Sequence, residues 1–64
     1  MANKKTLHSF ANHKIRILKE HPEYDSNMLT VGDNNVLFNV YMRVTNYEFE
    51  QFMIRYLQRK KEER

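Results

Sequence analysis

Residues 36–44 of the 64-residue chain, VLFNVYMRV, decide the fold that the sequence predicts. Apolar and polar side chains alternate along this stretch, as they do in a strand with one buried face. Residues 32–35, GDNN, are typical of a turn, and residues 28–31 are a short strand candidate. The sequence therefore predicts a β-hairpin. One face would carry Val36, Phe38, Val40, Met42 and Val44, and the other Leu37, Asn39, Tyr41 and Arg43.

Before the hairpin, residues 4–20 have the spacing of an amphipathic helix. Its apolar arc consists of Leu7, Phe10, Ala11, Ile15, Ile17 and Leu18. The opposite, polar arc consists of Lys5, His8, Ser9, Asn12, His13, Arg16 and Lys19. Because Pro22 cannot continue a helix, we expect the helix to end near Glu20. A strand over residues 13–19 is the alternative, but Leu18 breaks its alternation.

After the hairpin, a second helix is predicted to begin at Thr45. Residues 45–48, TNYE, match a capping box, in which the Thr hydroxyl and the Glu carboxylate each accept a backbone N–H of the other residue. An apolar stripe follows, made of Phe49, Phe52, Met53, Tyr56 and Leu57. We expect the charged tail, residues 60–64, to fray.

These elements predict a single α+β domain over residues 1–64. Its order is helix–β-hairpin–helix (αββα), with both helices on one face of the hairpin. A chain this short buries a small core, and it has no cysteine for disulfides. Two hairpins that pair edge to edge would protect each other's unpaired backbone groups. We therefore predict a homodimer.

The net charge of +3 is unevenly distributed. Residues 1–19 carry five bases and no acid, residues 20–50 carry one base and six acids, and residues 51–64 carry five bases and two acids. The polar arc of the first helix holds residue types that contact phosphates and base edges, which favours DNA or RNA as partner. An ordinary solvated helix face is the alternative. The predicted nucleic-acid-binding residues are Lys5, His8, Asn12, Arg16 and Lys19. The basic end of the second helix is predicted to assist with phosphate contacts through Arg55, Arg59, Lys60 and Lys61.

The sequence offers no arrangement typical of catalysis, so we expect neither enzyme activity nor a cofactor. It has no Gly-rich phosphate loop and no nucleophile elbow. His8 and His13 are five residues apart, whereas helical histidines that share a metal are four apart, so no metal site is expected. The longest apolar-rich run is too short to cross a bilayer. The lack of cysteine fits a cytoplasmic location.

The sequence leaves two functions open. The first is a small non-enzymatic nucleic-acid-binding regulatory protein that acts by occupying a site. The second is a small inhibitor or adaptor, of the type that phages and mobile elements encode, which docks on a larger protein. The residues predicted for such a partner interface are Leu37 and Tyr41 on the outer hairpin face, and Tyr47 and Ile54 on the second helix.

Overall fold

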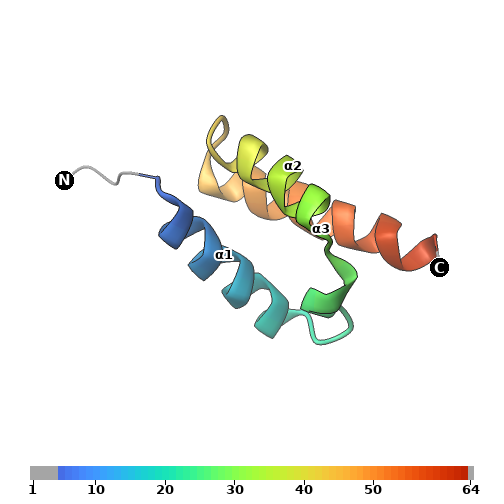
Figure 1. The fold of residues 1–64 in the computed structure, drawn as a ribbon. Helices are drawn as coiled ribbons and strands as arrows, with labels where there is room; N and C mark the ends of the chain where they lie inside the picture. Colours follow the sequence, from blue (N-terminus) through green and yellow to red (C-terminus); the bar gives the residue numbers. More distant parts are fainter. Residues whose placement is uncertain (1–4, 64) are drawn as a thin grey trace.

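The chain folds into three helices in the computed structural model, which describes residues 5–63 (Figure 1). Helix α1 spans Leu7–Glu20, α2 spans Val31–Tyr41 and α3 spans Asn46–Glu62, while a short 3-10 helix, η1, spans Ser26–Met28. Residues 5–63 include no β-strand. The predicted α+β fold is therefore wrong, and the architecture is all-helical.

The predicted hairpin is replaced by α2, which begins with its own capping box. The Thr30 hydroxyl accepts the backbone N–H of Asp33 at 3.1 Å, and the Asp33 carboxylate accepts the N–H of Thr30 at 2.9 Å. The residues read as a turn, 32–35, form the first turn of this helix. Its buried side chains are Asp33, Leu37 and Tyr41, which are four residues apart and therefore share one side of the helix.

Tertiary burial outweighs the strand preference of this segment. Valine in a helix costs at most about 0.7 kcal/mol relative to alanine. An N-cap contributes about 1 kcal/mol, and full burial of a large apolar side chain contributes about 1.5–3 kcal/mol. Leu37 is 0% exposed in α2, whereas its neighbour Val36 is 43% exposed. The hairpin would have reversed these two environments.

Helix α1 is confirmed and ends at Glu20 as predicted, but it begins at Leu7, with Thr6 as its N-cap. Lys5 therefore precedes the helix, and the predicted first residue, 4, lies outside the described residues. The apolar arc of α1 is only partly right. Phe10 and Ile17 are buried, but Leu7 is 66% and Ile15 is 56% exposed. Two members of the predicted polar arc face inward instead: Ser9 contacts Tyr41 of α2, and His13 contacts Tyr41 and Phe49 of α3. The side of α1 that faces the core is therefore rotated about the helix axis relative to the predicted one.

Helix α3 begins as predicted, because Thr45 and Glu48 form the reciprocal capping box. Phe49, Met53 and Leu57 are fully buried on one side of it. The helix continues through residues 60–62, so these members of the predicted frayed tail are helical. Arg64 lies outside the described residues.

The three helices meet in an aromatic core. The ring of Tyr41 lies 5.6 Å from that of Phe10 and 5.0 Å from that of Phe49, so each helix contributes one ring. Helices α2 and α3 lie side by side (Figure 1), and α1 packs against both of them, since Phe10 also lies 5.9 Å from Phe49. The homodimer was predicted from strand edges, and no strand lies in residues 5–63 to provide them. None of the helices in this range combines the length and the apolar character needed to cross a membrane.

Two adjacent substitutions test whether residues 31–41 are helical. Leu37→Ala is expected to lower the free energy of unfolding by about 2–5 kcal/mol, because it opens a cavity in the core. Val36→Ala is expected to change it by less than about 0.5 kcal/mol, because Val36 faces solvent. Urea denaturation followed by circular dichroism measures both values. A larger loss for Val36→Ala than for Leu37→Ala would contradict the helix.

Candidate functional site

Two of the three Lys and Arg residues predicted for the basic arc, Lys5 and Arg16, make contacts within the protein. Lys5 donates its ammonium group to the backbone carbonyls of Tyr41 and Val44, which closes the turn after α2. This contact makes Lys5 a capping residue of the fold, because its charge is used on carbonyl oxygens that would otherwise lack partners.

Arg16 is also partnered. Its guanidinium lies 3.4 Å from the Glu20 carboxylate and 3.7 Å from that of Glu50 on α3. His8, Asn12 and Lys19 are exposed, as the sequence predicted. Of the cations predicted for this surface of α1, Lys19 is thus the one for which residues 5–63 provide no ion pair or hydrogen bond.

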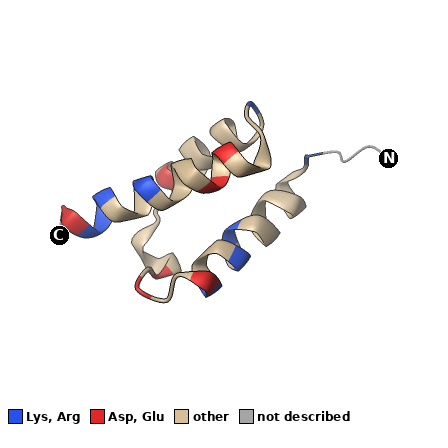
Figure 2. Ribbon diagram, turned by 180° about the vertical axis from the view of Figure 1, so that it is seen from behind, with Lys and Arg blue, Asp and Glu red and all other residues tan. Residues whose placement is uncertain are grey.

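Arg55 and Arg59 lie on a different side of the molecule from the basic residues of α1. Figure 2 shows Lys and Arg positions both on α1 and on the C-terminal half of α3. Arg16 touches α3 at Glu50, and Arg55 and Arg59 are about 140° and 180° further around that helix at 100° per residue. The structure therefore does not join the two predicted groups into one surface.

Arg55 and Arg59 line a surface cleft, here called the α3 cleft. It has a volume of about 510 Å³ and lies between α3 and the start of α2. Its walls are Asp33, Phe52, Arg55, Tyr56, Arg59, Lys60 and Glu63. Both arginine side chains are exposed, and within residues 5–63 neither has an ion pair or a side-chain hydrogen bond. Two cations on the rim are therefore free to contact an anion.

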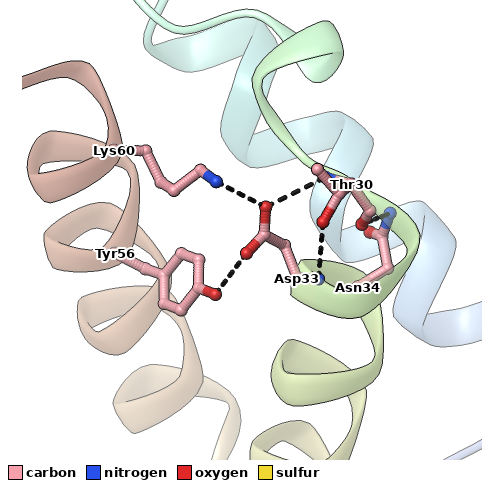
Figure 3. Close-up of polar contacts among 5 residues, drawn as sticks. All are labelled: Thr30, Asp33, Asn34, Tyr56 and Lys60. Carbon is pink, nitrogen blue, oxygen red and sulfur yellow. Dashed lines mark hydrogen bonds and ion pairs between the residues drawn. The ribbon is translucent and has the colours of Figure 1, made fainter. Parts of the chain in front are cut away.

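Asp33 organises the inner wall of the α3 cleft (Figure 3). One carboxylate oxygen accepts the Tyr56 hydroxyl at 2.5 Å, and the other accepts the Lys60 ammonium at 2.8 Å and the Thr30 N–H at 2.9 Å. Asp33 is 9% exposed, so these contacts replace most of its hydration. They connect the first turn of α2 to two successive turns of α3.

The same contacts fix the protonation states of the wall. The Lys60 hydrogen bond, followed by those from Thr30 and Tyr56, holds the pKa of Asp33 well below its usual range. The hydrogen bond to Asp33, with burial as the second cause, raises the pKa of Tyr56 to about 12. At neutral pH the carboxylate is therefore charged and balanced by Lys60, and Tyr56 is a neutral donor.

Phe52 and Tyr56 place aromatic surface in the α3 cleft. They are one turn apart on α3, their ring centroids are 5.8 Å apart, and the rings are tilted by 44°. Both side chains are half-buried, packed against the core on one side and open to the cleft on the other. The cleft thus combines an aromatic floor with a basic rim.

The residues predicted for a protein interface divide into two pairs. Leu37 and Tyr41 are buried in the core, which excludes them from a surface, because the segment is a helix and they lie on its inner side. Tyr47 is 72% exposed and Ile54 is half-buried, so this pair does lie at the surface of α3.

Asp33, Phe52 and Tyr56 were not predicted as site residues, whereas Lys60 was predicted as a phosphate contact and is instead paired with Asp33. Asp33 was assigned to a turn, although residues 30–33, TVGD, have the spacing of a capping box. Phe52 and Tyr56 were assigned to the apolar stripe, and only burial separates them from Phe49 and Met53. Lys60 is a base near a helix end, and the sequence carries no signal of its distant partner.

Other kinds of site are less well supported. Residues 5–63 contain no group of three His, Cys, Asp or Glu side chains placed to hold a metal ion. Comparisons of the chain with protein-family models, with curated proteins and with solved structures found no match. The function is therefore argued from the chemistry of the α3 cleft.

Replacement of Asp33 tests the inner wall of the cleft. The pKa of Asp33 is below its ordinary value of 3.8, so its contribution to stability is present above that pH and is lost as the pH falls towards the folded pKa. Asp33→Asn is expected to lower the free energy of unfolding at neutral pH by about 1–3 kcal/mol. It should also weaken the dependence of stability on pH between about pH 5 and 2.

Urea denaturation at a series of pH values measures this dependence. Glu62→Gln is the matched control, since it removes an exposed carboxylate of α3 and should leave the stability nearly unchanged. Equal pH slopes for the wild type and for Asp33→Asn would show that Asp33 does not hold these contacts.

Proposed function

We propose that this protein is a small non-enzymatic regulatory protein that binds nucleic acid through the α3 cleft and acts by occupying a site. The observation that carries the proposal is the pair of exposed guanidinium groups, Arg55 and Arg59, on the rim of a cleft with an aromatic floor. Phosphate contacts supply most of the affinity of sequence-independent binding, and arginine is well suited to them.

The position of the arginines supports contact with two phosphates of one strand. Residues four apart on a helix are about 6 Å apart along its axis. Each guanidinium can therefore form a bidentate pair with its own phosphate. Neither arginine has to break an ion pair with a carboxylate to do so, because none is formed within residues 5–63. Glu63 is the one acid of the lining without an ion pair in residues 5–63, and it follows Arg59 by four residues, so it lies one helical turn beyond that arginine.

The expected affinity is modest. Neutralising two phosphates gives a slope of log K against log salt of about −1.4 to −1.8. Raising the salt from about 50 to 200 mM should then weaken binding about sevenfold to twelvefold. A cytoplasmic location, with which the absence of cysteine is compatible, would give the protein access to DNA and RNA.

Docking on a larger protein is the second candidate function. It is favoured by Tyr47, which is 72% exposed, and by the half-buried Ile54 two turns further along α3. Exposed tyrosine is a frequent anchor of protein interfaces. These two residues lie on α3 outside the lining of the α3 cleft, so the two functions use separable surfaces.

Two charge-matched double variants test the proposed function. Arg55→Gln with Arg59→Gln should remove most of the binding and reduce the salt slope by about 1.4–1.8. Arg16→Gln with Lys19→Gln removes the same charge from α1 and should change binding little, because neither residue lines the α3 cleft. Fluorescence anisotropy with labelled oligonucleotides at about 50 and 200 mM salt measures both.

If binding is lost in the Arg16→Gln/Lys19→Gln variant and kept in the Arg55→Gln/Arg59→Gln variant, the nucleic-acid-binding surface lies on α1 and not at the α3 cleft. Absence of binding by the wild type at the lower salt concentration would reject nucleic acid as the partner. The protein-docking function would then be tested with Tyr47→Ala and Ile54→Ala.

A further inference from the structure

We infer that the α3 cleft takes single-stranded nucleic acid, with an unpaired base stacked against Phe52 and Tyr56 and the adjoining phosphates held by Arg55 and Arg59. This inference rests on the proposed function and makes it more specific. It names the form of the nucleic acid and adds two residues that contact the base.

The aromatic floor provides the first argument. Phe52 and Tyr56 are half-buried, so each packs one side on the core and leaves another side at the cleft. Stacking on an aromatic side chain is the common way in which proteins hold unpaired bases, and it tolerates any base because each one has a π-face. Aromatic side chains flanked by arginines are the combination that such sites use.

The fixed position of the Tyr56 ring provides the second argument. Its hydroxyl donates to Asp33, which is itself held by the Thr30 N–H and by Lys60 (Figure 3). The ring is therefore oriented before any ligand arrives, which lowers the entropy that binding costs. Lys60 balances Asp33, and Glu63 offsets one of the two arginines, so the three bases and two acids of the lining leave a net charge of +1 on the side of Arg55 and Arg59.

The concave shape provides the third argument. Proteins read duplex DNA by placing a protruding helix or strand in a groove about 12 Å wide. Here the basic and aromatic side chains line a hollow of about 510 Å³ beside the helix. A paired base is covered by its neighbours in the stack and cannot enter a hollow, whereas an unpaired base can.

The test compares a short labelled oligothymidylate, a short oligouridylate and a mixed-sequence duplex by anisotropy at about 50 mM salt. Phe52→Leu keeps most of the packing volume and removes the π-face. The matched control is Phe38→Leu on α2, because Phe38 is also half-buried against the core but does not line the cleft. Thermal melts of both variants establish that they are folded.

The inference predicts that the single strands bind more tightly than the duplex. It also predicts that Phe52→Leu weakens single-strand binding about fivefold to a hundredfold with an unchanged salt slope, while Phe38→Leu has no such effect. The oligothymidylate and oligouridylate together show whether DNA, RNA or both are accepted. A strand containing 2-aminopurine should lose fluorescence on binding the wild type, and lose less with Phe52→Leu.

Two results would overturn the inference and leave the proposed function standing. One is a duplex that binds as tightly as the single strands and still depends on Arg55 and Arg59. The other is Phe52→Leu binding like the wild type. Absence of any binding by the wild type would instead reject the proposed function and this inference together.

Discussion

The hydrogen-bonded carboxylate of Asp33 is the constraint on which the rest of the structure depends. It caps the start of α2 through Thr30 and ties that turn to α3 through Tyr56 and Lys60. A carboxylate with so little exposure is costly unless its oxygens are paired, and here each oxygen has a donor. The network sets where α2 begins, which side of α3 faces it and where the wall of the α3 cleft stands.

The fold could be predicted from the sequence at both ends of the chain but not in the middle. The apolar spacing identified α1 and α3, together with Pro22 after α1 and the capping box at the start of α3. Residues 31–44 fit two periods, because apolar side chains at every second position from Val36 to Val44 suggest a strand, while Leu37 and Tyr41 are four residues apart and fit a helix. The choice is made by tertiary contacts of Tyr41 with Phe10 and Phe49, which local sequence does not contain.

The candidate site could be predicted only in part for the same reason. Arg55 and Arg59 were identified as binding residues because basic side chains near a helix end are visible in the sequence. The commitment of Lys5 to carbonyls 36 and 39 residues away is not visible, and neither is the pairing of Arg16 with Glu50. A basic stripe on a helix therefore overstates the charge available to a ligand when the fold uses those cations itself.

Nuclear magnetic resonance of the backbone amides and arginine side chains, with a short oligothymidylate added in steps, tests the account most directly. The account predicts that the strongest shifts occur at Phe52, Arg55, Tyr56 and Arg59, with little change at His8, Asn12 and Lys19. Shifts centred on those three α1 residues, or none at all, would contradict the assignment of the α3 cleft as the functional site.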